Sequence, residues 1–169
     1  MIEDLIEIYE EIIICKNLYG YFPSVNNRKS STKSGNRPKS IFFGYKNNRL
    51  YPNEKEYRGN ARYPYLYNLL KEFAKKHLPN HKYNNILVNR SVQFLKHKDK
   101  GNVIDSKNII VGIGDYEGGG LTVFDDNNNP TTYDIWCNPL EFNPYSFHQV
   151  EDFKGDRITI TYYLRELKQ

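Results

Sequence analysis

The sequence predicts a mainly β protein of the α+β class, a double-stranded β-helix (jelly roll) of about eight strands buttressed by N-terminal helices. Two observations lead to this prediction. Apolar residues follow helical spacing in two stretches, both in the first half of the chain. Short runs rich in β-branched and aromatic residues then follow one another to the end, separated by turn-forming residues.

Two helices are expected, over residues 2–15 and 64–77. Pro64 suits the first position of the second helix, where its missing N–H costs nothing. The apolar residues with helical spacing are Ile2, Leu5, Ile6, Tyr9, Ile12 and Ile13 in the first helix and Leu66, Leu69, Leu70 and Phe73 in the second. Both helices are therefore expected to be amphipathic.

The expected strands lie mostly after the second helix. They are NILVNR, VQFLK, NIIVGIG, LTVF, TTYDIWC, FHQV and RITITYYLR, with IFFGY before the second helix as an eighth. The separators GDYEGGG and DDNNNP are typical of turns. With 169 residues and no internal repeat, the chain is expected to form one domain. Residues 1–84 would form its helical, basic part and residues 85–169 its jelly-roll core.

The positive charge is concentrated in one part of the chain. The net charge is +4, but residues 16–62 hold eleven Lys and Arg against two Glu, a local balance of +9. This region includes the polar stretch VNNRKSSTKSGNRPKS. The stretch is either an ordinary solvated loop or an arm that contacts the phosphates of a nucleic acid.

Composition also limits the setting of the protein. No apolar run is long enough to cross a bilayer, and the acidic start MIEDLIE does not resemble a signal peptide. Cys15 and Cys137 are the only cysteines, which fits a reducing intracellular compartment, either nucleus or cytoplasm. The protein is expected to be a monomer that does not bind membranes.

The segment HKDKGN, residues 97–102, holds the first candidate site residues. His97 and Asp99 alone could be an ordinary surface pair, because such a spacing arises often by chance. However, His148 lies in a late strand that a jelly roll can bring beside His97. Two imidazoles and one carboxylate would bind iron and leave open positions on the metal, although hydrolytic zinc is a rival use of the same ligands.

The C-terminal strand favours iron over zinc. Arg157 and Thr159 are two residues apart, so their side chains lie on the same face of the strand. An arginine with a hydroxyl beside it can hold a carboxylate through two hydrogen bonds. A hydrolytic zinc site has no need of such a clamp. The alternative is a surface arginine in a salt bridge.

The order His-x-Asp, distal His and Arg-x-Thr resembles the Fe(II)/2-oxoglutarate dioxygenases. Within them, HKDKGN is similar to the His-Arg-Asp-Ile-His-Asn segment of the TET/JBP branch, the 5-methylpyrimidine DNA dioxygenases. RITITYYL resembles that branch's Arg-Ile-Ser-Leu-Val-Phe-Tyr segment, and VGIGDYEGGGLTVFDD is similar to its small algal, fungal and viral members. The resemblance covers residues 85–164 well and 41–84 loosely, and a viral origin fits it.

The resemblance implies an enzyme that oxidises the 5-methyl group of a flipped base in methylated DNA, with 5-methylcytosine favoured over thymine. It also implies the cofactors Fe(II), 2-oxoglutarate as cosubstrate, and O₂. The residue roles that it implies are His97, Asp99 and His148 as iron ligands and catalytic residues, Arg157, Thr159 and Asn89 for the cosubstrate, and Asn102 and Tyr163 for the base.

The sequence departs from this branch in several ways. Arg165 stands where the animal enzymes have a histidine, and their cysteine-rich zinc-binding region is absent. A second cosubstrate arginine is not evident, and Arg62 and Arg90 are the candidates. Ascorbate could replace 2-oxoglutarate, as in an algal relative. A protein side-chain hydroxylase, an RNA or nucleotide oxidase, and a non-enzymatic binding module remain as alternatives.

Overall fold

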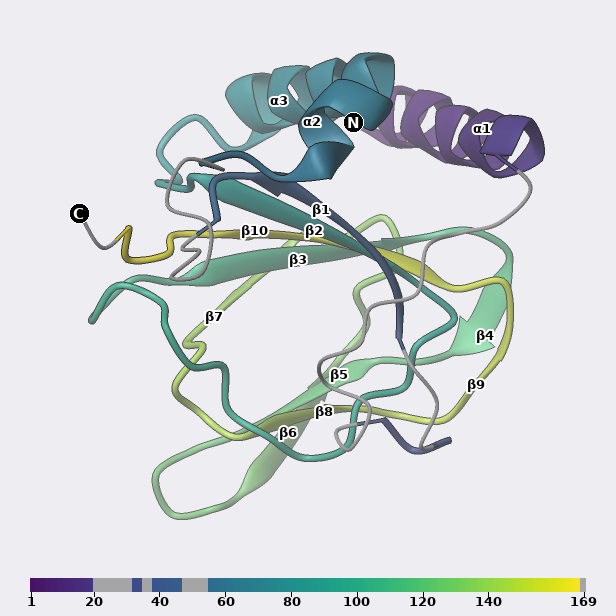
Figure 1. Ribbon diagram of the computed structural model, residues 1–169. Helices are drawn as coiled ribbons and strands as arrows, with labels where there is room; N and C mark the ends of the chain where they lie inside the picture. The colour runs from purple at the N-terminus through teal and green to yellow at the C-terminus, as the bar shows by residue number, and fades with distance from the viewer. Residues whose placement is uncertain (20–31, 35–37, 47–54, 168–169) are drawn as a thin grey trace.

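The computed structural model describes residues 1–19, 32–34, 38–46 and 55–167. Its helices are α1 (Ile2–Tyr19), α2 (Arg58–Arg62) and α3 (Pro64–His77), and they lie on one side of the molecule (Figure 1). In α1 the buried residues are Leu5, Ile8, Ile12 and Cys15, whereas Ile2 and Ile6 are exposed. The apolar spacing therefore predicted the buried face of α1 only in part, because isoleucines occur nearly all around this helix.

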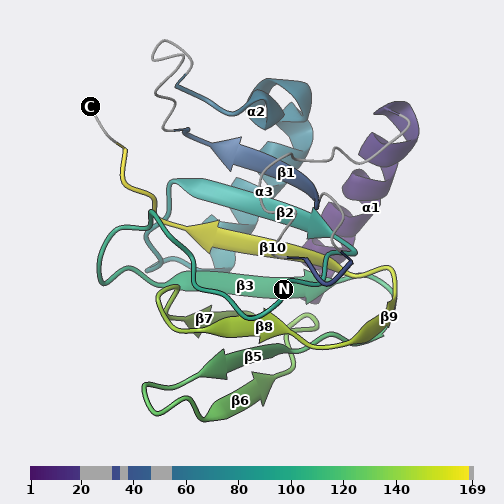
Figure 2. The ribbon, with the colours of Figure 1, turned by 60° about the horizontal axis from the view of Figure 1, so that its bottom comes forward.

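A five-stranded antiparallel sheet lies beneath the helices. Its strands, in spatial order, are β1 (Lys39–Gly44), β2 (Asn85–Arg90), β10 (Ile158–Tyr163), β3 (Asn108–Ile113) and β7 (Leu140–Phe142). The chain's last strand is thus inserted between two earlier ones, as Figure 2 shows. This places the residues of RITITYYLR in the centre of the sheet.

A smaller sheet faces the first. It consists of β6 (Pro130–Tyr133), β5 (Leu121–Phe124) and β8 (His148–Val150), and a separate pair is formed by β4 (Tyr116–Gly118) and β9 (Phe153–Gly155). Figure 1 shows the two sheets as opposed layers, with the helices outside the larger one. The predicted jelly-roll fold with N-terminal helices is confirmed.

The two faces of the large sheet pack against different parts of the protein. On β10, Ile158, Ile160 and Tyr162 are fully buried in the core that the sheet shares with α1 and α3. Because side chains alternate along a strand, Thr159 and Tyr163 lie on the opposite face, toward the small sheet. A second apolar core fills part of the space there; it consists of Val92, Phe94, Ile110, Leu121, Ile135, Phe142 and Val150.

Some local predictions were wrong. Among the described residues, VQFLK is not a regular strand; it forms an isolated bridge at Phe94, and another follows at His97. Ser91, with φ of 50°, turns the chain out of β2 immediately before this segment. GDYEGGG is not only a turn, because it contains β4, and TTYDIWC is a strand only in its first half. Strands β7 and β9 and helix α2 were not predicted.

Three further expectations concern the basic stretch, the two cysteines and the length of the helices. Most of VNNRKSSTKSGNRPKS lies outside the described residues, so the basic arm stays a prediction. Cys15 and Cys137 are both free thiols. Within the described part of the chain, every helix is too short or too polar to cross a bilayer.

Candidate metal centre and carboxylate clamp

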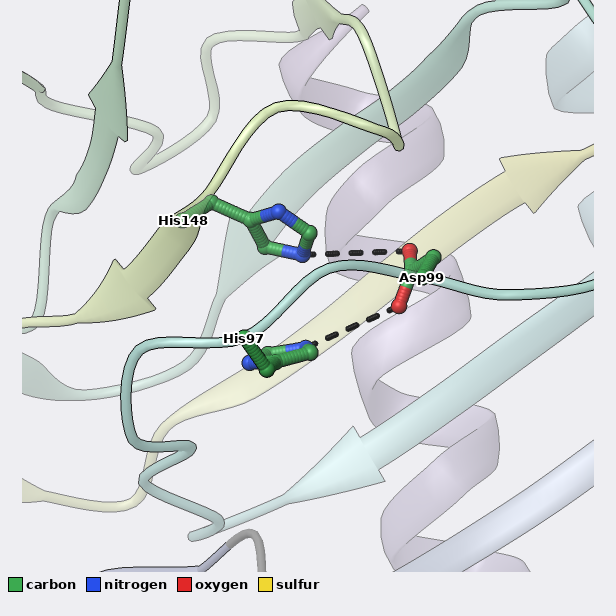
Figure 3. A group of neighbouring side chains, drawn as sticks. All are labelled: His97, Asp99 and His148. Atoms are coloured by element: carbon green, nitrogen blue, oxygen red, sulfur yellow. Dashed lines mark ion pairs between the residues drawn. The ribbon is translucent and has the colours of Figure 1, made fainter. Parts of the chain in front are cut away.

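Three side chains from two segments that are far apart in the sequence meet between the two sheets. His97 and Asp99 lie on an extended segment after β2, and His148 is the first residue of β8. Two backbone hydrogen bonds, of 3.0 and 2.9 Å, join His97 to His148 and bring the segments together. Figure 3 shows the two imidazoles directed at the carboxylate, with Nε2–O distances of 3.6 Å from His97 and 3.8 Å from His148.

The backbone sets the tautomer of both histidines. His97 Nδ1 lies 2.6 Å from the carbonyl oxygen of Leu95, and His148 Nδ1 lies 2.9 Å from that of Ser146. A carbonyl can only accept, so each Nδ1 carries the proton and each Nε2 presents its lone pair to Asp99 and the space between the rings. Such outer hydrogen bonds are typical of histidines that bind metal ions.

The donor set fits one divalent transition-metal ion. Ligand atoms of His97, Asp99 and His148 all lie within 4.8 Å of one another. His148 is nearly buried, and the other two side chains are each 18% exposed, so the centre is reached from one side. Two imidazoles and one carboxylate are the facial set that suits non-haem iron, while zinc is compatible with the same ligands.

Arg157 lies immediately before β10, on the inner face of the large sheet, and is 2% exposed. Its Nε donates to the carbonyl of Gly119 at 3.0 Å, but its buried Nη2 has no hydrogen-bond partner among the described residues. Burial lowers the pKa of Arg157 to about 10, so the guanidinium is still charged at neutral pH. A buried cation with an unsatisfied N–H is costly unless an anion completes it.

Tyr116 stands beside this arginine and was not predicted as a site residue. The guanidinium lies 5.7 Å from the ring of Tyr116 and 5.4 Å from that of Phe153. The buried Tyr116 hydroxyl also has no hydrogen-bond partner in the described part of the chain. A Cβ on Gly112 would lie only 2.1 Å from this hydroxyl, so the glycine makes room for it. Burial raises the pKa of Tyr116, which keeps the phenol protonated and able to donate.

A polar row crosses the inner face of the sheet beside the clamp. Ser40, Asn89 and Thr159 are neighbours in register on β1, β2 and β10, and all three are buried. The Ser40 hydroxyl donates to Asn89 Oδ1 at 2.6 Å, which leaves the amide nitrogen of Asn89 as its donor toward a ligand. The predicted cosubstrate residues Arg157, Thr159 and Asn89 therefore share one face.

The two predicted base contacts lie elsewhere. Tyr163 is on the same face of β10 as Thr159, but six residues beyond Arg157, which is about 20 Å along the strand. Asn102 is buried, and its amide nitrogen donates to Asn108 at 2.7 Å. The structure therefore places Tyr163 at the far end of the strand from the clamp and directs Asn102 into the protein.

Neither candidate for a second cosubstrate arginine faces this site. Arg90 donates from Nε and Nη2 to Asp156 at 2.8 and 2.6 Å, beside Tyr9 of α1. Arg62 lies on α2 with its guanidinium 5.6 Å from the ring of Tyr63, a residue of the helix-side core. Both arginines therefore belong to the helical side of the large sheet.

No protein-family model matches the sequence, and no curated protein matches it significantly. Solved structures do match. They include a 2OG-Fe(II) oxygenase family oxidoreductase from Burkholderia pseudomallei (TM-score 0.53, 15% identity, 75% of this chain and 66% of that one). OsALKBH1 matches with TM-score 0.56 and 16% identity over 95% of this chain and 91% of that one. A Pseudomonas putida prolyl-4-hydroxylase matches with TM-score 0.54 and 11% identity over 94% and 86%. The likeness shows that the chain has the fold of these proteins.

Proposed function

We propose that the protein is an Fe(II)/2-oxoglutarate-dependent dioxygenase. The observation that supports it most is the presence of two preorganised features between the two sheets of a jelly roll. His97 and His148 present their Nε2 atoms beside Asp99, and Arg157 holds a buried N–H that has no hydrogen-bond partner among the described residues. A zinc hydrolase explains the first feature but gives no use for the second.

The protein's own residues would hold and orient the reactants. His97, Asp99 and His148 would bind Fe(II), which supplies oxidation by O₂ coupled to decarboxylation of the cosubstrate. The distal carboxylate of 2-oxoglutarate would occupy the pocket of Arg157 and Tyr116, with Thr159 and Asn89 beside it. Burial of this pocket keeps water away from the charged contacts and strengthens them.

For the substrate, we propose a 5-methylpyrimidine in DNA, with 5-methylcytosine ahead of thymine. The resemblance of HKDKGN and RITITYYL to the TET/JBP branch supports it. Charge beside the site is a second support, because Lys96, Lys98 and Lys100 are exposed while the intervening His97 and Asp99 point inward. One segment would thus bind the metal on one side and phosphates on the other.

Two of the three lysines of this segment lie over aromatic rings. Lys96 Nζ lies 3.6 Å from the ring centroid of Phe124, and Lys98 Nζ lies 4.5 Å from that of Phe147. Phe147 is 43% exposed and directly precedes the iron-binding candidate His148. Cations and an exposed ring around the entrance suit a nucleic acid, in which phosphates and bases alternate.

Oxidation of methylated oligonucleotides tests this function directly. The protein, Fe(II), 2-oxoglutarate and O₂ are incubated with duplexes that carry 5-methylcytosine or only unmodified bases, and the nucleosides are analysed by mass spectrometry. We expect an oxidised 5-methyl group, with one succinate released for each oxidation step. Hydroxylation of a peptide array with no product on DNA would point instead to a protein hydroxylase, the activity named for the Pseudomonas putida neighbour.

Variants at the predicted base pocket should uncouple the reaction. In Tyr163→Ala and Asn102→Ala, both assayed at saturating Fe(II), we expect product on methylated DNA to fall, while slow consumption of 2-oxoglutarate without substrate continues. Aromatic stacking contributes about 1–3 kcal/mol per base, so Tyr163→Ala should weaken DNA binding roughly 5- to 150-fold. Tyr133→Ala, at an exposed tyrosine on β6, is the matched control. Parental product yields in both variants would remove these residues from the base pocket.

Tyr116→Phe should have opposite effects on the free and the liganded protein. Removing a buried, unpartnered hydroxyl should leave the free energy of unfolding of the apo-protein unchanged or raise it by about 1 kcal/mol. The same change removes a donor to the cosubstrate carboxylate, so the Kd for 2-oxoglutarate should rise about tenfold. Thermal unfolding and calorimetric titration measure the two effects. An unchanged Kd would exclude Tyr116 from the clamp.

A further inference from the structure

Two buried asparagines form a hydrogen-bonded chain behind the candidate metal ligands. Asn108 is the first residue of β3 and is 2% exposed, and its Nδ2 donates to Asp99 Oδ2 at 3.0 Å. Asn102, 5% exposed, donates from its Nδ2 to Asn108 Oδ1 at 2.7 Å. The chain therefore runs from Asn102 through Asn108 to the carboxylate, away from solvent.

The direction of these two hydrogen bonds follows from the chemistry of the Asp99 carboxylate. An ionised carboxylate only accepts hydrogen bonds, so Asn108 has to present its NH₂ group to Asp99. The carbonyl oxygen of the same amide then faces Asn102, which has to present its own NH₂ group. Each amide thus has one permitted orientation, although an isolated asparagine amide could turn over.

The outer end of the chain is held by the fold. Tyr145 donates its hydroxyl to the backbone carbonyl of Asn102 at 2.6 Å. Asn102 also forms a β-bridge with Arg165, just after β10. At the inner end, Asn108 pairs with Phe142 of β7 in the large sheet. Asn108 is therefore fixed by the large sheet, and Asn102, which lies on the same segment as Asp99, is anchored by its bridge to Arg165 and by Tyr145.

We propose that Asn108 and Asn102 are positioning residues of the metal centre: together they hold the Asp99 carboxylate in its ligating orientation. The carboxylate can rotate about its Cβ–Cγ bond, and the hydrogen bond from Asn108 restricts this rotation. Asn102 acts one step further out, by keeping the amide of Asn108 from turning over. The inference rests on the proposed metal site and assigns Asn102 a task in addition to its predicted base contact.

Titration with Mn(II), followed by its electron paramagnetic resonance signal, tests the proposal without turnover. Asn108→Leu removes the donor at nearly constant volume and should weaken Mn(II) binding about 10- to 100-fold, as loss of an outer-shell partner typically does. Asn85→Leu is the matched control, because Asn85 is a fully buried asparagine at the first residue of β2 and its amide oxygen accepts from Tyr45. This control should bind Mn(II) with parental affinity.

Asn102→Asp provides the sharper test, because the substituted side chain touches neither the metal nor Asp99. An aspartate can only accept, so it should turn the amide of Asn108 over and direct its oxygen at Asp99. We expect Mn(II) affinity to fall about tenfold or more, with a changed resonance signal. An asparagine with a purely structural role would leave the affinity unchanged once the variant is folded, as judged by circular dichroism.

The outcomes separate this proposal from the proposed function. If the parent binds Mn(II) and folded Asn108→Leu and Asn102→Asp bind it equally well, the positioning role is wrong while the metal centre stands. If the parent does not bind Mn(II) or Fe(II), the proposed function itself is wrong. Should Asn108→Leu fail to fold, the double variant Asn102→Leu/Asn108→Leu replaces it, because removing both partners leaves no buried donor unsatisfied.

Discussion

Replacing any one of His97, Asp99 and His148 by alanine should abolish Fe(II)-dependent turnover, with the fold retained. Each residue supplies one ligand of a three-ligand site, so two ligands remain and metal affinity should fall by more than the roughly 10- to 100-fold typical of outer-shell changes. Fe(II) titration under anaerobic conditions measures the affinity, and release of succinate measures turnover. The largest effect is expected for His148, which is the most buried of the three.

The chain offers a matched control for this experiment. His81 is a partly buried histidine whose Nε2 lies 3.2 Å from the carbonyl of Tyr162, on the helical side of the sheet. His81→Ala should leave iron affinity and turnover at the parental level. An iron-free, zinc-loaded preparation with full activity would overturn the assignment of the site to iron.

Arg157→Ala should raise the Kd for 2-oxoglutarate by about 100-fold or more and leave iron binding nearly unchanged. Each hydrogen bond to a charged partner contributes about 1.5–3 kcal/mol, and two such bonds are lost with the guanidinium. Arg157→Lys should restore only part of the affinity, because an ammonium group cannot form the parallel pair. Calorimetric titration of the metal-loaded protein measures both variants, with exposed Arg58→Ala as the control.

Thermal unfolding distinguishes the two candidate cosubstrates, 2-oxoglutarate and ascorbate. If Arg157 holds the cosubstrate, 2-oxoglutarate should raise the melting temperature of the parent but not of Arg157→Ala, since a ligand stabilises the folded protein only when it binds to it. A protein that oxidises its substrate with ascorbate and shows no shift with 2-oxoglutarate would contradict the clamp. The assignment of His97, Asp99 and His148 would be unaffected by that result.

Much of the fold could be predicted from local patterns. The runs NILVNR, NIIVGIG and RITITYYLR became β2, β3 and β10, because β-branched residues buried on both faces favour central strands. The order of His97, Asp99 and His148 in the sequence predicted that they would meet, because a jelly roll brings late strands back beside early ones. In contrast, β4 and β9 are three-residue strands that, within the described part of the chain, pair only with each other, and so short a strand has no recognisable pattern.

Tyr116 and Asn108 could not be recognised in the same way. The chain has fifteen tyrosines, and Tyr116 lies in a glycine-rich segment that indicates a turn. Its place in the clamp depends on Gly112, which leaves space for the hydroxyl, and on the position of Arg157. In the sequence, Asn108 is an ordinary asparagine at the start of a strand, and only the tertiary structure shows its hydrogen bond to Asp99.

The sequence by itself determined the kinds of group that are available: two histidines and a carboxylate with metal-binding spacing, and an arginine on a strand that also carries a hydroxyl. It also determined the alternation that separates Ile158, Ile160 and Tyr162 from Thr159 and Tyr163. Only the tertiary structure decided which atoms meet. The Nδ1 protons of the histidines and the orientation of the Asn102 and Asn108 amides depend on contacts set by the fold. So does the environment of Arg157, whose Nη2 has no hydrogen-bond partner among the described residues; Arg157 and its acceptor Gly119 are 38 residues apart. Such contacts form only when long loops close, and local residue patterns do not specify them.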